Sequence, residues 1–252
     1  DLYFFIDNEN KKNQDAIYEK LLALIIVLCI CFTGVISWKL ENKSEGSTLS
    51  NLVKRVEDTS VLTSASKAKG NDLIIVNKQN FLENDYVPEN LVRPNIPFLE
   101  DCTEEEMQLQ KHAAKALERL VNAAKDENIT LIGSSGYRSY QTQVEVYNSY
   151  CKKKGKSYTL QYVASPGSSE HQTGLAIDIT NSSRYFDKNS KEAKWLADNA
   201  YKYGFILRYL EGKTDITGYN YEPWHIRYVG KKVAKEIYNN SETLEEYLER
   251  LG

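Results

Sequence analysis

Histidine is scarce in this sequence, which has only three in 252 residues. A metal site that uses imidazole ligands must therefore be built from a short list. Cysteine is scarce as well, and two of the four, Cys29 and Cys31, lie within an apolar run, where we expect them to pack as small hydrophobic residues. The other two, Cys102 and Cys151, can be oxidised in an exported domain but are too few for a disulfide framework. The CxxC pairs of a structural zinc site are also missing.

A large excess of charge of either sign is missing too. The formal net charge is -3, with 41% hydrophobic and 27% charged residues. Because no strongly basic face is implied, we expect no nucleic acid partner. The composition is that of one ordinary globular domain with an additional segment.

That additional segment is residues 21–38, which carry no charge and are flanked by Lys20 and Lys39. This length crosses a bilayer core of roughly 30 Å. A buried soluble helix would show a polar stripe, which the segment lacks. A cleaved signal peptide has a shorter apolar core followed by a small-x-small site, which residues 34–38 match poorly. We therefore expect a retained single-pass transmembrane anchor after a cytoplasmic tail of residues 1–20.

Beyond the anchor, composition separates two further parts. Residues 39–70 are rich in Ser, Lys, Glu and Thr without a sustained apolar period, and are expected to form an extracellular stalk. Residues 71–252 are expected to form the folded domain. Predicted strands lie at 73–76, 129–132, 174–179, 205–209 and 224–228; predicted helices follow Thr103, Ser139 and Ser190 and close the chain. Because helices and strands do not alternate regularly, the predicted class is α+β.

The first stretch with chemical interest is residues 169–178. If 174–179 is a strand, Leu175 and Ile177 point toward a core, whereas Ala176 and Asp178 point to the opposite face. Small residues leading to a carboxylate leave space above that face. His171 lies just before the strand and is close enough in sequence to fold back over it.

The second stretch is residues 222–228. In a regular strand, His225 and Arg227 share one face and Ile226 points to the other. Glu222 is three residues from His225, which would place the two side chains on opposite faces. Pro223 is unfavourable inside a strand ladder and indicates a turn or bulge, which would bring Glu222 back beside the histidine.

Together these residues fit a hydrolytic metal site. Two histidines and one carboxylate suit zinc and leave the fourth position for water. A further carboxylate that is not a ligand can take a proton from that water and pass it to a leaving amine. On spacing alone a purely structural interpretation stays open, because His171 can be a structural hydrogen-bonding residue and Asp178 can cap a turn.

The two stretches also match a known family. Residues 169–178 carry the pattern SxHxxGxAxD, with Ser169-Glu170-His171 in place of a longer gap, and Glu222 to His225 supply a paired ExWH. They resemble the zinc D-alanyl-D-alanine carboxypeptidase family, specifically its VanY-like branch. Shorter likenesses at 76–78, 85–88, 136–139, 216–219 and 227–230 extend the resemblance over roughly residues 72–238.

The resemblance implies a compact α+β domain whose central antiparallel sheet is flanked by helices, as in lysostaphin-like peptidases and hedgehog domains. It implies the zinc ligands His171, Asp178 and His225, with Glu222 as the general base. Arg138 matches the arginine that polarises the scissile carbonyl and stabilises the oxyanion. Residues similar to those that hold the terminal D-amino acid are Gln143, Ser169 and Tyr209. His112 has no counterpart and is interpreted as structural.

The implied activity is removal of the terminal D-alanine from peptidoglycan stem peptides, with D,D- and L,D-specificity both open. We expect a monomeric zinc enzyme at the cell membrane, with its catalytic domain outside. Three alternatives stay open: an endopeptidase of the same fold, a metal-bearing wall-binding module, and a structural wall protein. The residues after Gly204, which would enclose a terminal carboxylate, favour the exopeptidase, and Glu222 argues against a pure binding module.

Overall fold

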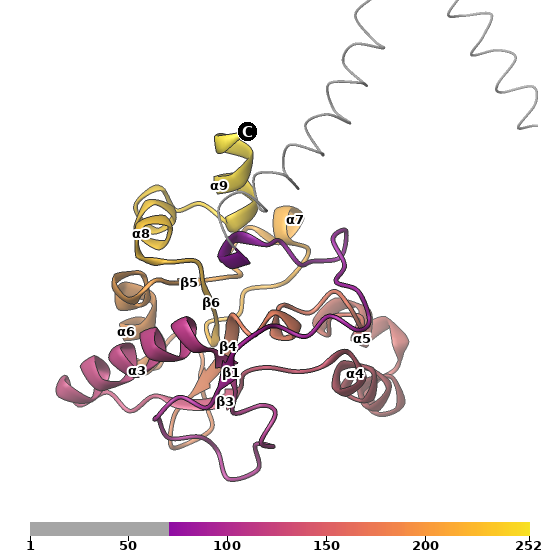
Figure 1. Ribbon diagram of the computed structural model, residues 1–252, viewed down its shortest axis with the longest axis horizontal. Helices are drawn as coiled ribbons and strands as arrows, with labels where there is room; N and C mark the ends of the chain where they lie inside the picture. Colours follow the sequence, from indigo (N-terminus) through magenta and orange to yellow (C-terminus); the bar gives the residue numbers. More distant parts are fainter. Residues whose placement is uncertain (1–70) are drawn as a thin grey trace, which may run out of the picture. The chain divides into compact units, whose positions relative to one another are not determined.

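The computed structural model describes residues 71–252, which belong to one compact unit (Figure 1). The expected cytoplasmic tail (1–20), transmembrane anchor (21–38) and stalk (39–70) lie outside the described residues. Between residues 71 and 252, no helix combines the length and apolar character that a membrane span requires.

A four-stranded antiparallel sheet lies at the centre of the domain, in the order β3-β4-β6-β5. Its strands are β3 (Ile132–Ser135), β4 (Ala176–Thr180), β5 (Phe205–Leu207) and β6 (His225–Tyr228). A smaller sheet pairs β1 (Leu91–Val92) with β2 (Leu109–Gln110). The predicted α+β class and central antiparallel sheet are thus confirmed.

The two faces of the central sheet differ. One face is apolar, and its fully buried Leu175, Ile177 and Ile226 join the main core with α3 (Lys111–Asp126) and α6 (Lys191–Asn199). In Figure 1, α4 (Tyr140–Lys154) and α5 (Lys156–Tyr162) lie on the other side of the sheet. The apolar residues alternate along β4 as the sequence predicts, so the intervening polar residues face the side of α4 and α5.

A second apolar cluster attaches the C-terminal helices. Ile206 and Val229 pack with Ala234, Leu244 and Leu248. The remaining elements are η1 (Asn71–Leu73), η2 (Glu170–Thr173), η3 (Ala200–Tyr203), α7 (Thr214–Thr217), α8 (Lys231–Asn240) and α9 (Leu244–Leu251). A capping box of Thr243 and Glu246 begins α9. The C-terminal helices are therefore packed parts of the domain.

The strand predicted at residues 73–76 is wrong. Only η1 forms there, and residues 74–76 have no regular secondary structure. The carbonyls of Asp72 and Ile74 instead accept hydrogen bonds from Nη2 of Arg227, at 3.0 and 2.8 Å. A buried side chain thus satisfies backbone groups that a ladder would otherwise pair.

The first long helix begins later than predicted. Thr103 and Glu106 do exchange the hydrogen bonds of a capping box, yet α3 starts at Lys111. The carbonyls of Glu106 and Gln108 accept from the backbone N–H groups of Gly136 and Tyr137, so this segment supports a loop instead of continuing as a helix.

Other local predictions hold with small shifts. Ser139 and Ser190 cap α4 and α6 through their hydroxyls, as predicted. The strand predicted at 129–132 is displaced by three residues, since β3 begins at Ile132 and shares only this residue with the prediction. Cys102 and Cys151 are both free thiols.

Candidate active site

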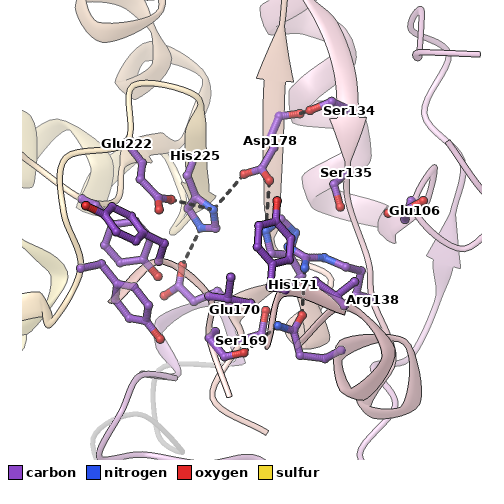
Figure 2. Close-up of a pocket in the computed structure, with 18 residues that line it drawn as sticks. Glu106, Ser134, Ser135, Arg138, Ser169, Glu170, His171, Asp178, Glu222 and His225 are labelled. Atoms are coloured by element: carbon purple, nitrogen blue, oxygen red, sulfur yellow. Dashed lines mark hydrogen bonds and ion pairs between the residues drawn. The ribbon is translucent and has the colours of Figure 1, made fainter. Parts of the chain in front are cut away.

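Three side chains with metal-ligand chemistry meet on the polar face of the sheet (Figure 2). His171 comes from η2, Asp178 from β4 and His225 from β6, where Asp178 and His225 are directly paired in the ladder. Asp178 lies between the two rings: its Oδ2 is 3.5 Å from Nε2 of His171 and its Oδ1 is 3.0 Å from Nδ1 of His225. One ligand atom from each residue lies within 4.8 Å of the others. The three predicted ligands are therefore assembled.

Hydrogen bonds on the far side of each ring determine which nitrogen faces this centre. Nδ1 of His171 is 2.7 Å from the carbonyl of Gly136, which only accepts, so this nitrogen carries the proton and Nε2 is free. Nε2 of His225 is 3.4 Å from Oε2 of Glu170, which leaves Nδ1 beside Asp178. Oriented imidazoles with such partners are typical of zinc sites. The donor set fits zinc with one position left for water.

The charges of the cluster are strongly perturbed. Burial, followed by the nearby charge of Arg138, lowers the pKa of His171 to about 3. Burial also opposes protonation of His225, but hydrogen bonds to the carboxylates of Asp178 and Glu170 prevail and raise its pKa to about 9. Burial would raise the pKa of Asp178, yet the two histidines hold it well below its usual range. The carboxylates around His225 therefore favour positive charge at this centre, which a bound cation would also supply.

Glu222 lies on the metal side of the strand, as the turn at Pro223 predicts. The amide of His225 donates to the carbonyl of Glu222, which closes a turn, and Oε2 of Glu222 is 4.0 Å from Nδ1 of His225. Burial raises the pKa of Glu222 to about 7, despite the lowering effect of His225. A carboxyl group with this pKa can both take and return a proton near neutral pH.

Arg138 enters from the loop between β3 and α4. The loop leaves no space for a side chain at Gly136, because an added Cβ would lie only 2.6 Å from the carbonyl oxygen of Gln108. The Arg138 amide donates to the carbonyl of His171, and its Nη1 donates to Oε1 of Gln143 at 2.9 Å. Its buried Nε has no hydrogen-bond partner among the described residues. Arg138 lines the cavity, so its guanidinium group is placed beside a bound ligand.

The three predicted substrate-binding residues line the same cavity of about 410 Å³. Both ends of the Gln143 amide are used within the protein, since Nε2 donates to the carbonyl of Ala164 at 2.7 Å. Ser169 is buried at the start of η2. The ring of Tyr209 lies 4.9 Å from that of His225. All eight predicted site residues thus line one cavity.

Comparison with known proteins shows the family of this chain. A family model described as VanY, D-alanyl-D-alanine carboxypeptidase, matches residues 106–231, which include every predicted site residue. The chain is 47% identical over 186 residues to the putative carboxypeptidase YodJ of Bacillus subtilis, covering 72% of this chain and 68% of that protein.

This chain belongs to the VanY D-alanyl-D-alanine carboxypeptidase family. The predicted enzyme class, a carboxypeptidase of this type, is thereby confirmed.

Two solved structures of the VanY-family fold are similar to this chain. The LdcB LD-carboxypeptidase has a TM-score of 0.65 and 47% identity, covering 69% of this chain and 84% of that one. A mutant of the D,D-pentapeptidase VanY, in complex with Zn(II), has a TM-score of 0.59 and 36% identity, covering 70% and 98%. The first is named for L,D-specificity and the second for D,D-specificity. The second contains zinc, the metal that suits the His-Asp-His cluster of this chain.

Sequence reasoning missed the support beneath this VanY-family site. Glu170 is fully buried, and its Oε1 accepts from Arg208 and Arg227 at 2.7 Å each. Its Oε2 lies 3.4 Å from Nε2 of His225, at the other end of the ring from the nitrogen that contacts Asp178. One signal was visible, because Arg227 shares a strand face with His225. No spacing in the sequence indicated Arg208.

Proposed function

We propose that this chain is a zinc-dependent carboxypeptidase that removes the C-terminal D-alanine from peptidoglycan stem peptides. The observation that carries the proposal is Glu222, a carboxylate outside the three-ligand set that lies 4.0 Å from His225 with a pKa raised to about 7. A metal-bearing binding module has no need of such a group. The names of the two structural neighbours support the substrate class.

His171, Asp178 and His225 would hold the zinc ion, which when bound supplies Lewis-acid activation of water and of the scissile carbonyl. Glu222 takes one proton from the attacking water while the water oxygen bonds to the carbonyl carbon. It then delivers that proton to the nitrogen of the departing D-alanine as the C–N bond breaks. Arg138, which lines the cavity, uses its guanidinium group to hold the carbonyl oxygen as negative charge develops there.

Product analysis tests the reaction and its specificity together. The purified chain is incubated with zinc and stem peptides ending in D-Ala-D-Ala or in L-Lys-D-Ala, and the products are weighed by mass spectrometry. Loss of one alanine from the pentapeptide, which ends in D-Ala-D-Ala, identifies a D,D-enzyme. Loss of one alanine from the tetrapeptide, which ends in L-Lys-D-Ala, identifies an L,D-enzyme. Cleavage only inside the peptide supports the endopeptidase alternative. No cleavage of either peptide by the zinc-loaded protein overturns the proposal.

We also propose that residues 21–38 anchor the chain in the cell membrane, with residues 39–70 as a stalk and the catalytic domain as an extracellular monomer. The uncharged length of the segment and its flanking lysines support this arrangement. Protease added to intact cells should remove the domain and leave a membrane-bound fragment. Full protection of the domain in intact cells, with digestion after lysis, would contradict it.

A further inference from the structure

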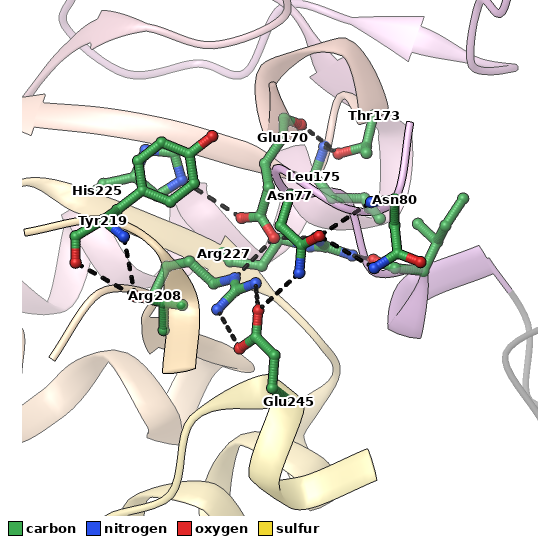
Figure 3. Close-up of polar contacts among 12 residues, drawn as sticks. Asn77, Asn80, Glu170, Thr173, Leu175, Arg208, Tyr219, His225, Arg227 and Glu245 are labelled. Atoms are coloured by element: carbon green, nitrogen blue, oxygen red, sulfur yellow. Dashed lines mark hydrogen bonds and ion pairs between the residues drawn. The ribbon is translucent and has the colours of Figure 1, made fainter. Parts of the chain in front are cut away.

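A buried ion cluster extends from the metal site to the C-terminal helix (Figure 3). Arg208, fully buried just beyond β5, donates through Nε to Oε1 of Glu170 at 2.7 Å. Its other two nitrogens donate to Glu245 on α9, at 2.8 and 2.6 Å. Arg227 donates to the same oxygen of Glu170. The two arginines and two glutamates therefore form one cluster, which connects α9 to the Glu170 carboxylate in contact with His225.

The cluster balances its charges. Arg208 and Arg227 supply two positive charges, and Glu170 and Glu245 supply two negative charges. Neither arginine has any solvent exposure, and the Glu245 side chain is only 16% exposed. Because an unpaired buried charge is costly, the loss of any one member changes the field felt by the others. Glu245 is the member farthest along the chain from the ligands.

We propose that Glu245 is a positioning residue for the metal site, which it controls through Arg208, Glu170 and the orientation of His225. The inference rests on the proposed zinc site and extends it to the C-terminal helix. With Glu245 in place, Arg208 divides its charge between two carboxylates. Glu170 then retains enough negative charge to accept the Nε2–H of His225, which keeps Nδ1 directed at the metal.

The direction of the effect follows from this arrangement. Replacing Glu245 with glutamine leaves Arg208 to be neutralised by Glu170 alone. Glu170 then supports His225 less strongly, and the region beneath the ligands gains one net positive charge. Both changes oppose the binding of a divalent cation. A helix that merely closed the fold would change stability without changing metal affinity.

The test measures zinc affinity of the whole 252-residue chain in detergent, by competition with a chromogenic chelator at fixed pH, alongside thermal unfolding of the metal-free protein. Glu245→Gln should raise the zinc dissociation constant about 10-fold, the lower end of the range for outer-shell substitutions. Glu249→Gln, on the exposed part of the same helix, is the matched control and should leave it unchanged.

A rescue variant separates charge from packing. Asn77 donates to Oε1 of Glu245 at 3.2 Å, so Asn77→Asp in the Glu245→Gln background returns the charge to the same cluster. The oxygen of Asn77 accepts from the amides of Gln79 and Asn80, and an aspartate keeps that acceptor. The double variant should recover most of the lost zinc affinity.

Several results would overturn the inference. Wild-type zinc affinity in Glu245→Gln, with a lowered unfolding temperature, would make Glu245 a structural residue only. If Glu245→Gln does not fold, Glu245→Asp keeps the charge but withdraws it from Arg208 by one methylene, and unchanged affinity there has the same meaning. A wild-type chain that binds no zinc would overturn the proposed function itself, and this inference with it.

Discussion

Two glutamates lie on opposite sides of His225, in regions of opposite character. Beneath the ring, Glu170 is excluded from solvent, and two arginines each contact it at 2.7 Å. Burial would raise the pKa of Glu170, yet these arginines hold it far below its usual range. Above the ring, Glu222 faces the cavity with its side chain 18% exposed, and in the described part of the chain no lysine or arginine forms an ion pair with it.

The contrast shows how one residue type supplies two functions. Paired with arginines, Glu170 is a permanent anion that orients a ligand and cannot exchange protons near neutral pH. Without such partners, Glu222 has a pKa raised to about 7 by burial and is suited to proton transfer. Environment, not residue type, separates the base from the support. The following substitutions test this separation.

The largest effect is expected for Glu222→Gln, which keeps the shape of the side chain and removes its proton-accepting carboxylate. Turnover of the stem peptide should fall by about 10²–10⁴-fold, the usual contribution of a general acid-base. Zinc content should stay at the wild-type level, because Glu222 is not a ligand. Steady-state kinetics with metal analysis of the same sample checks both.

The matched control is Asp215→Asn, which changes an exposed carboxylate on α7 and should leave turnover unchanged. Loss of zinc in Glu222→Gln would make Glu222 a ligand and place the role of Asp178 in doubt. Near-normal turnover with zinc bound would assign the base to another carboxylate.

The next largest effect on turnover is expected for Arg138, which lines the cavity. Arg138→Lys keeps a positive charge but loses the planar fork and the Nε–H that has no partner in the described structure. We expect kcat to fall by about 10²–10³-fold, as for the loss of one oxyanion donor. Zinc affinity should not change. Arg93→Lys, at an exposed position, is the control, and an unchanged kcat in Arg138→Lys would remove Arg138 from the mechanism.

On the buried side, Glu170→Gln should affect metal binding and folding more than the chemical step. Zinc affinity should fall about 10–100-fold, because His225 loses the partner that orients it. The free energy of unfolding should fall by roughly 3–5 kcal/mol, because Arg208 and Arg227 lose their shared carboxylate. Zinc titration and urea unfolding of the metal-free protein measure the two. At saturating zinc kcat should stay within about 10-fold of wild type, and a larger loss would give Glu170 a direct part in proton transfer.

The positions of Asp178 and Glu222 were predictable from the sequence. Alternation along 174–179 placed Asp178 opposite the core, and Pro223 indicated the turn that returns Glu222 to the metal side. These are local signals, set by strand period and backbone geometry. The family resemblance indicated that the distant segments meet, and it supplied the role that we propose for Arg138.

The buried side was not predictable in the same way. Glu170 and Arg208 are 38 residues apart and meet only because η2 and β5 pack beside β6. The failed strand at 73–76 has a related cause, because a side chain, Arg227, satisfies carbonyls in that segment. The hydrophobic periodicity predicts which residues are buried. It does not predict which polar side chain will hydrogen-bond to a backbone carbonyl that lies outside a strand ladder.

The smallest effect is expected for Gln143, which was predicted to bind substrate directly. Both ends of its amide are used internally, holding Arg138 on one side and the carbonyl of Ala164 on the other. Gln143→Ala should therefore lower kcat about 10-fold through a misplaced Arg138 and leave KM nearly unchanged. In an Arg138→Ala background it should cause no further loss, because coupled residues are not additive. A raised KM with an unchanged kcat, or a full additional loss in the double variant, would instead make Gln143 a direct substrate ligand.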